Sequence, residues 1–286
     1  MQKIALPGGD QRQIFLADAL RRRGFRIMGF GNLAEPAGKT LAETLDGAKI
    51  VVLPVPATRD GENLSQSAKE TPPIRFGEVL NFLAPGAFLL GGALPREWIA
   101  AAEARGIRSA DYYKSERTQL LNALPTAEGA LRLAMQALPT TLFGTQTVVV
   151  GYGRIASLLS EKLVALGAKV GVLARSPEAL ARAELHGANP YALGQGVPPF
   201  LADCRVLFNT VPECVLDRSF LQALPQNCIL IELASLPGGF DADLAKKAGF
   251  QVISAQGLPG RFYPETAGKI LADAVCAILN ANGFLD

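Results

Sequence analysis

The stretch Thr-Val-Val-Val-Gly-Tyr-Gly-Arg-Ile-Ala at residues 147–156 indicates the fold of the second half of the chain. Its first four residues form a β-branched, uncharged run of the kind found in buried parallel strands. The Gly-x-Gly-x-x-Ala pattern that follows matches the turn and helix of a dinucleotide-binding site. We expect Gly151 to permit the tight turn and Gly153 to admit a pyrophosphate. The first helical N–H groups, at Arg154 and Ile155, are expected to face the phosphates.

Two residues after the next strand indicate which dinucleotide binds. The strand expected at 169–173 leads into Arg175 and Ser176, and the first carboxylate beyond them is Glu178. An NAD site tends to place Asp or Glu here for the ribose 2′-hydroxyl, whereas Arg can bind the 2′-phosphate of NADP. The sequence therefore favours NADP(H) over NAD(H). The alternative is an exposed loop arginine beside a glycine motif that serves only as a turn.

The composition limits the class of protein. The chain has 286 residues, enough for two domains, and a formal net charge of only +2, which argues against a nucleic-acid partner. It has no signal segment and no uncharged run of ~20 residues, so we expect a cytoplasmic protein without a membrane span. The 4 cysteines lack metal-site spacing, and no metal site is expected. The single histidine, His186, lies at an expected helix end, so we do not expect histidine catalysis.

The first half of the chain alternates strands and helices. Strands are expected at 3–6, 25–30, 49–53, 87–90 and 106–109, a rhythm typical of a parallel sheet covered on both faces. We therefore predict an α/β protein with two Rossmann-like domains, residues 1–125 and 126–286, and a cleft between them. Thr126 is expected to cap the first helix of the second domain. The last helix, 265–280, is expected to pack back across the hinge.

Loops after strands carry the candidate substrate residues, because function collects at the carboxyl ends of parallel strands. The turn at 8–12 places Asp10 and Arg12 at a helix start, and a long polar segment from 54 to about 73 contains Thr58 and Arg59. Each has an ordinary alternative: Asp10 as a helix cap and Arg59 as a solvated loop charge.

Further loops of the second half are candidates for cofactor contacts. A strand expected at 205–209 ends in Asn209, Thr210, Val211 and Pro212, a position that commonly lies beside the adenosine of a dinucleotide. Ser235 lies in the loop at 234–239. A Gly/Pro-rich loop is expected at 256–264, where Gly257, Leu258 and Pro259 offer backbone groups.

Several motifs along the whole chain resemble the A subunit of dipicolinate synthase. They are Gly-Gly-Asp-Gln-Arg-Gln at 8–13, Leu-Pro-Val-Pro-Ala-Thr at 53–58, Asn-Ala-Leu-Pro-Thr-Ala-Glu-Gly at 122–129, Gly-Tyr-Gly-Arg at 151–154, Leu-Ala-Ser-Leu-Pro-Gly-Gly at 233–239, Gly-Leu-Pro-Gly at 257–260 and Thr-Ala-Gly-Lys-Ile-Leu at 266–271. The last two are much more specific than a glycine turn. The family has Lys where this chain has Glu265, which puts any role of that lysine in doubt, although Lys269 follows one helical turn later.

The resemblance implies a sporulation enzyme of the mother-cell cytoplasm that makes pyridine-2,6-dicarboxylate. Its substrate would be dihydrodipicolinate or the 4-hydroxy-tetrahydro precursor, and it would work with a flavoprotein-like second subunit. The implied fold is that of formate and D-2-hydroxy-acid dehydrogenases. Homo-oligomer formation is left open.

The chemistry of that reaction assigns tasks to the candidates. The product ring is aromatic, so the protein mainly positions the ring and accepts a proton. Two substrate carboxylates call for cations or N–H donors, which we assign to Arg12, Arg59 and the hydroxyl of Thr58. Ser235 and the backbone at 257–259 would complete the contacts to the substrate from the second domain. Asp10 and Glu128 are the candidate proton acceptors, with Glu128 equally explained as a helix first-turn acid.

Two other functions stay open. One is a cofactor-binding or assembly subunit without an active site of its own, and the polar loops at several strand ends in both halves argue against it. The other is an NADP-dependent reductase of a different small acid. Turnover of 2-oxo or imino acids in place of the cyclic dicarboxylate would indicate it.

Overall fold

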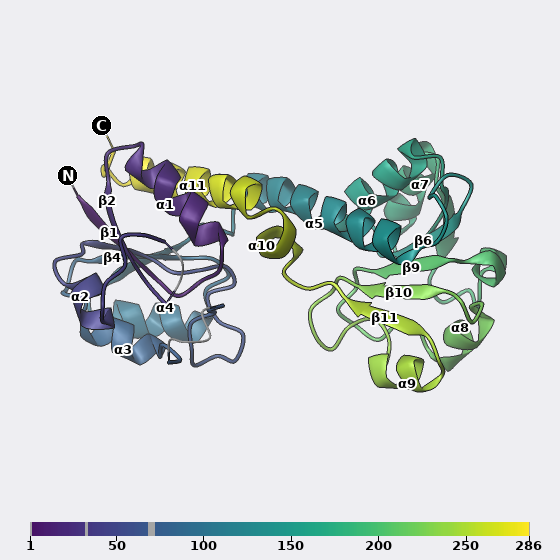
Figure 1. Cartoon of the computed structure of the whole chain (residues 1–286), viewed down its shortest axis with the longest axis horizontal. Coiled ribbons are helices and arrows are strands. Elements are labelled where there is room, and N and C mark those ends of the chain that lie inside the picture. Colours follow the sequence, from purple (N-terminus) through teal and green to yellow (C-terminus); the bar gives the residue numbers. More distant parts are fainter. Residues whose placement is uncertain (1, 32–33, 68–71, 286) are drawn as a thin grey trace. The chain divides into compact units, whose positions relative to one another are not determined.

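The computed structural model describes residues 2–31, 34–67 and 72–285 of the chain. The chain divides into two compact units, residues 1–122 with 259–286 and residues 123–258. Each contains one parallel β-sheet with helices packed against it (Figure 1). The predicted α/β architecture with two parallel sheets is confirmed.

The first unit contains a five-stranded sheet in the order β2-β1-β3-β4-β5. The strands are β1 (Lys3–Pro7), β2 (Arg26–Phe30), β3 (Ile50–Val52), β4 (Phe88–Gly91) and β5 (Arg108–Asp111). The chain runs outward from β1 to β2 and then returns to the other side of β1 with β3. The order therefore reverses between β1 and β3, which is where open α/β sheets bind their ligands.

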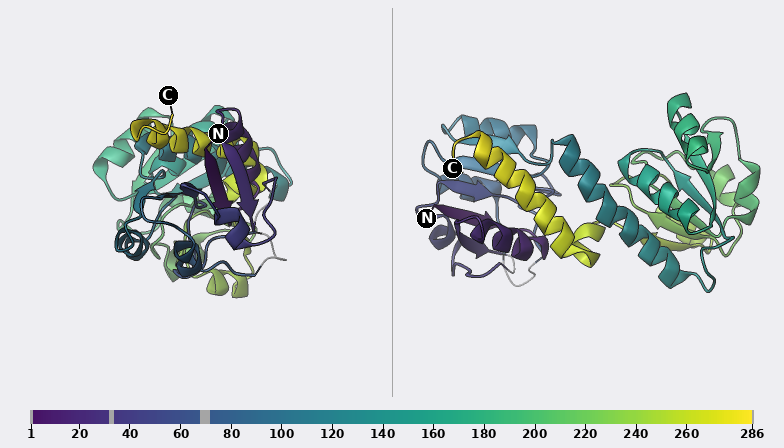
Figure 2. Two further views of the ribbon diagram at one scale, coloured as in Figure 1. Left: turned by 90° about the vertical axis from the view of Figure 1, so that its left-hand side faces the viewer. Right: turned by 90° about the horizontal axis from the view of Figure 1, so that it is seen from above.

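Helices cover both faces of this sheet. The helices of the unit are α1 (Arg12–Arg21), α2 (Leu41–Leu45), α3 (Phe76–Asn81), α4 (Arg96–Glu103) and α11 (Pro264–Ala281). Ile4 and Leu6 point into one buried cluster with α1 and α11, whereas Ala5 points into the other, beneath α2, α3 and α4. Alternate residues of one strand thus reach opposite cores. Figure 2 shows α11 (yellow) lying along α1 (purple).

The second unit contains a six-stranded sheet in the order β11-β10-β9-β6-β7-β8. The strands are β6 (Gln146–Val150), β7 (Lys169–Ala174), β8 (Asn189–Ala192), β9 (Val206–Asn209), β10 (Ile229–Glu232) and β11 (Gln251–Ser254). The helices are α6 (Arg154–Ala165), α7 (Pro177–Leu185), η1 (Pro199–Asp203), α8 (Arg218–Ala223) and α9 (Ala242–Lys247). This is the strand order of a dinucleotide-binding sheet, with its reversal between β6 and β9.

Two local predictions were wrong. Thr126 does not start a helix, because α5 (Glu116–Ala137) runs unbroken through Pro125. The proline removes one N–H donor, but Leu121, whose carbonyl would have accepted from it, lies on the exposed side of the helix. Alanines on the opposite face, among them Ala127, are buried, and their packing stabilises the helix. The loop expected at 256–264 contains a short helix, α10 (Leu258–Phe262).

Gly268 explains how closely α1 and α11 approach each other. A Cβ on Gly268 would lie 2.6 Å from the backbone oxygen of Arg12 and 2.7 Å from Cβ of Phe15. Only glycine fits this crossing without a shift of one helix. Lys269, the next residue, forms an exposed ion pair with Glu265 at 2.6 Å.

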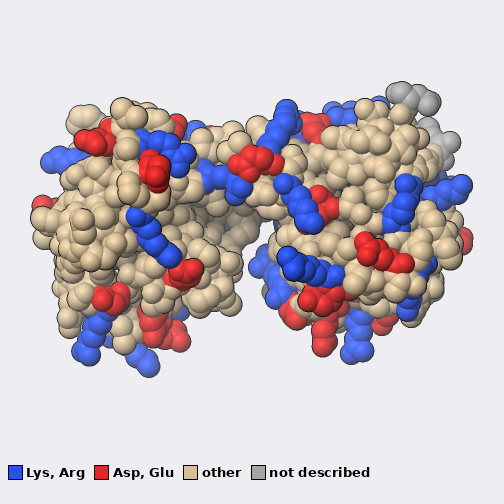
Figure 3. All heavy atoms as spheres, turned by 180° about the vertical axis from the view of Figure 1, so that it is seen from behind, with Lys and Arg blue, Asp and Glu red and all other residues tan. Residues whose placement is uncertain are grey.

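Charges of both signs are interspersed on the surface. Lysine and arginine lie among aspartate and glutamate on the face shown in Figure 3, without a continuous basic patch. Within the described parts of the chain, no helix is both long and apolar enough to cross a bilayer. The same residues include no cluster of three or more metal-ligating side chains.

Candidate functional site

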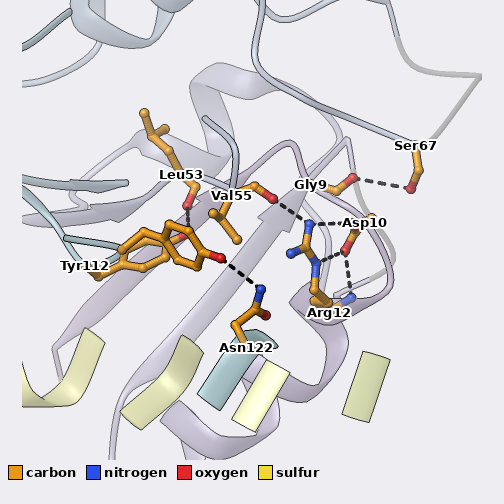
Figure 4. Close-up of polar contacts among 9 residues, drawn as sticks. Gly9, Asp10, Arg12, Leu53, Val55, Ser67, Tyr112 and Asn122 are labelled. Carbon is orange, nitrogen blue, oxygen red and sulfur yellow. Dashed lines mark hydrogen bonds and ion pairs between the residues drawn. The ribbon is translucent and has the colours of Figure 1, made fainter. Parts of the chain in front are cut away.

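An ion pair joins the two loops at the reversal point of the first sheet. Asp10 follows β1, and its carboxylate accepts from Arg12 Nε and Nη2, both at 2.8 Å, and from the backbone N–H of Arg12 at 3.0 Å. Arg12 Nη2 also donates to the carbonyl of Val55, in the loop after β3 (Figure 4). The side chain of Arg12 is 10% exposed and that of Asp10 is 26% exposed. The pair therefore fixes both loops in a largely buried position.

This pairing changes how the two residues are interpreted. Asp10 is more than a helix cap, because its carboxylate holds a guanidinium as well as an N–H group. Arg12 uses Nε and Nη2 within the protein, so its Nη1 is the donor left for a ligand, since no described residue accepts from it. A Cβ on Gly260 would lie 2.5 Å from Asp10 Oδ2, so α10 approaches this carboxylate closely.

The loop after β3 is organised by an aspartate that the sequence analysis did not single out. Asp60 accepts from the Thr58 hydroxyl at 3.1 Å, from the N–H groups of Glu62 and Asn63, and from the Asn63 side chain. These hydrogen bonds lower the pKa of Asp60. The Thr58 hydroxyl is therefore hydrogen-bonded within its own turn. Arg59 is exposed and pairs with no described residue, and residues 68–71 of the predicted polar segment lie outside the described part.

Two tyrosines support the same edge from the end of β5. Tyr112 is buried and donates to the carbonyl of Leu53 at 2.8 Å, and its burial raises its pKa. The Asn122 side chain donates to the hydroxyl of Tyr113 at 2.9 Å. These contacts tie the start of α5 to the loop after β3.

In the second unit, the two glycines of the turn between β6 and α6 differ. Gly151 has φ +95°, and a Cβ there would overlap the Thr210 hydroxyl, so the protein itself requires glycine. Gly153 has φ −84°, and a Cβ there would meet no atom of the described residues within 4 Å. No contact among these residues requires glycine at 153, whereas the close approach of a pyrophosphate would.

The start of α6 suits an anion. Gly153 is its N-cap and offers no side chain to accept from the first N–H groups, among them that of Ile155. Arg154 is the first residue of the helix and is exposed. Tyr152, between the two glycines, points away into the protein, where its hydroxyl lies 3.1 Å from His186 Nδ1. Burial raises the pKa of Tyr152. The residues present therefore fit a dinucleotide phosphate.

The two residues predicted for the 2′-phosphate have different surroundings. Ser176 caps α7, accepting from the N–H of Ala179 at 3.1 Å. Arg175 forms an ion pair with Glu213, a residue of the loop after β9. Glu213 was not among the residues predicted from the sequence, although a carboxylate directly after the predicted adenosine loop was a visible signal.

That loop is fixed by hydrogen bonds to two strands. The Thr210 hydroxyl donates to the carbonyl of Val150 at 2.7 Å. Asn209 is fully buried, donates to Glu232 Oε1 at 2.6 Å and to the carbonyl of Val211 at 2.9 Å. Pro212 follows at the end of the loop and is exposed.

Glu232 was also missed, although a carboxylate closing an apolar strand was a visible signal. It accepts from Asn209, from the N–H of Ala234 at 2.9 Å and from the N–H of Gly239 at 3.0 Å. Burial raises the pKa of Glu232, and these three hydrogen bonds act in the opposite direction. The residue orders the segment that contains Ser235, which is exposed.

The remaining candidates lie elsewhere in the fold. Glu128 is in the middle of α5 and pairs with Lys162 of α6 at 3.1 Å. Leu258 is fully buried and packs over Gly129, where a Cβ would lie 2.9 Å from Leu258 Cβ. Gly257 precedes α10 and Pro259 is its second residue. The structure thus groups Asp10, Arg12, Thr58 and Arg59 in the first unit and the predicted dinucleotide residues through Ser235 in the second.

The chain is similar to known proteins along its whole length. Residues 3–113 match the family model of the N-terminal domain of the dipicolinate synthase A subunit. The A subunit of dipicolinate synthase from Bacillus subtilis (strain 168) is 28% identical over 285 residues, covering 97% of this chain and 95% of that protein.

Solved structures agree. The dipicolinate synthase A subunit from Bacillus subtilis has a TM-score of 0.82 at 28% identity, with 98% of this chain and 96% of that chain covered. The corresponding protein from Bacillus halodurans has a TM-score of 0.83 at 26% identity, with 97% of each chain covered. D-lactate dehydrogenase from Escherichia coli shares the fold, with a TM-score of 0.64 at 14% identity over 100% of this chain and 98% of that chain. The resemblance predicted from the sequence motifs is confirmed.

Proposed function

We propose that this chain, which resembles the dipicolinate synthase A subunit from end to end, is an NADP-dependent dehydrogenase that oxidises a dihydropyridine dicarboxylate to dipicolinate. Similarity over 97% of the chain supports the place in dipicolinate synthesis. The observation that supports the nucleotide part is Gly153, a glycine beside open space at the start of α6, where a pyrophosphate could approach the backbone closely.

The second unit supplies the nucleotide contacts in this proposal. The turn from Gly151 to Gly153 and the N–H groups of Arg154 and Ile155 receive the pyrophosphate, because the first N–H groups of a helix and the positive end of its dipole both favour anions. Arg175 and Ser176 receive the 2′-phosphate. The loop at 209–212 lies beside the adenosine, and Ser235 and the backbone at 257–259 reach toward the substrate end.

The first unit supplies the substrate contacts. Arg59 and the Nη1 group of Arg12 provide donors for the two carboxylates of the ring, with Thr58 beside them. Asp10 is the first proton acceptor to test, because its carboxylate lies directly beside the guanidinium of Arg12 at that edge of the sheet. The ion pair with Arg12 orients this carboxylate. Glu128 is the second candidate, with its ion pair to Lys162 as the competing role.

The reaction balances with a single two-electron acceptor. The dihydro ring loses two hydrogens: one would leave as hydride, for which a nicotinamide held at the turn from Gly151 to Gly153 would supply the acceptor, and the other leaves as a proton to a carboxylate or to water. Formation of the aromatic ring provides much of the driving force. The residues of this chain bind the carboxylates, orient the ring and position the proton-accepting group.

The relatives are named as one subunit of an enzyme, so we also propose a partner, a flavoprotein-like second subunit, and a setting, sporulation in the mother-cell cytoplasm. The test uses the purified chain alone with freshly generated 4-hydroxy-tetrahydrodipicolinate and NADP⁺ or NAD⁺. Reduced nicotinamide and dipicolinate, each followed by its own absorbance, should grow together and faster with NADP⁺. Activity that needs the second subunit would assign the chemistry to the complex, and inactivity of both preparations would refute the proposed reaction.

A further inference from the structure

The Arg175–Glu213 ion pair spans the end of the central strand of the second sheet. Strand β6 pairs with β7 on one side and with β9 on the other. Arg175 directly follows β7, and Glu213 lies four residues beyond the end of β9. Their contact therefore crosses the carboxyl end of β6, where the Gly151–Gly153 turn begins.

The pair is exposed and easily opened. The side chain of Arg175 is 60% exposed and that of Glu213 is 66% exposed. Each is the only described partner of the other. An exposed pair of this kind is weak and screened by salt, so a ligand that competes for the guanidinium can replace the carboxylate.

The position of Arg175 makes the Glu213 carboxylate and a bound 2′-phosphate competitors for its guanidinium. The residue after the second strand of such a sheet faces the ribose 2′-group of a bound dinucleotide, and a guanidinium there favours a 2′-phosphate. A carboxylate already bound to that guanidinium has to be displaced by a 2′-phosphate but not by a 2′-hydroxyl. Its charge also opposes the phosphate.

We propose that Glu213 is a specificity-determining residue that competes with the 2′-phosphate of NADP(H) for Arg175 and so reduces the preference for NADP(H) over NAD(H). This inference rests on the proposed function for its cofactor. It adds Glu213, which follows β9 and weakens the interaction of Arg175 with the 2′-phosphate.

The test is calorimetric titration of the purified chain with NADP⁺, NAD⁺ and 2′,5′-ADP, without substrate. Glu213→Gln keeps the shape of the side chain and removes its charge. It should tighten NADP⁺ and 2′,5′-ADP by about 1.5- to fivefold and leave NAD⁺ unchanged. The gain should shrink at high salt and vanish in an Arg175→Gln background. Glu184→Gln is the matched control, because Glu184 is exposed near the end of α7 and forms no ion pair with a described residue. It should change neither affinity.

The outcomes separate this inference from the proposed function. If Arg175→Gln weakens NADP⁺ while Glu213→Gln has no effect or weakens it, competition is refuted and the NADP assignment stands. An equal gain for NAD⁺, or an equal effect of Glu184→Gln, would show a general charge effect and refute specificity. If Arg175→Gln leaves NADP⁺ binding unchanged, both the assignment of Arg175 to the 2′-phosphate and the competition by Glu213 are refuted.

Discussion

The two glycines of the β6–α6 turn should respond in opposite ways to the same added methyl group. Gly153→Ala places a Cβ where no protein atom lies within 4 Å, at an ordinary φ of −84°. Its cost in unfolding free energy should be only about 0.5 kcal/mol, the difference between Gly and Ala at a helix N-cap. The methyl group would occupy the approach to the phosphates, and we expect NADP⁺ affinity to fall by about tenfold or more, or ~1.4 kcal/mol.

The Cβ added by Gly151→Ala would contact protein atoms and not the ligand. The residue has φ +95°, and its Cβ would overlap the Thr210 hydroxyl, which is held by its bond to the carbonyl of Val150. Backbone strain and overlap together should cost about 2–4 kcal/mol of unfolding free energy. Urea unfolding followed by circular dichroism measures stability, and calorimetry measures NADP⁺ binding.

The comparison of the two variants gives the refutation. Equal NADP⁺ affinity of Gly153→Ala and the unaltered chain would show that no phosphate approaches this turn. A loss of stability in Gly153→Ala as large as in Gly151→Ala would show that the space beside Gly153 is filled in the folded protein.

Three further predictions concern stability. Arg12→Ala leaves a largely buried Asp10 unpaired and should lower the unfolding free energy of the first unit by about 2–4 kcal/mol. Fluorescence of Trp98, the single tryptophan, reports on that unit, and Arg21→Ala on the same helix should cost less than about 1 kcal/mol; equal losses would contradict the role of the network. Gly268→Ala should cost about 1–3 kcal/mol in the same assay, because its Cβ meets the backbone of α1, and an unchanged transition would contradict that packing. The folded-state pKa of Glu232 is raised above its ordinary value of 4.5, so its ionisation opposes folding. The stability of the unaltered chain relative to Glu232→Gln should therefore be greatest below that value and decline as the pH rises through the raised pKa; a constant difference would contradict the shift.

The sequence predicted the parts of the fold that depend on local patterns. The β-branched run at 147–150 followed by Gly151 and Gly153 specified a strand, a turn and a helix, because each step has its own residue requirement. The rhythm of short apolar runs specified two parallel sheets in the same way.

Other features depend on which strands become neighbours, and the local pattern holds no such information. Asp10 and Arg12 were identified as separate candidates, but their ion pair and its link to Val55 depend on β1 lying beside β3. Glu213 meets Arg175 only because β7 and β9 flank β6. A proline usually marks a helix boundary, yet Pro125 lies inside α5, because tertiary packing outweighed one lost hydrogen bond.

The central claim is that a hydride passes from the substrate ring to a nicotinamide bound by this chain. Its most direct test supplies ring-deuterated substrate and unlabelled NADP⁺ and measures the mass of the reduced nucleotide. We expect one deuterium in each NADPH and one NADPH for each dipicolinate formed. Dipicolinate formed without labelled NADPH would contradict the account, because the electrons would then have gone to another acceptor.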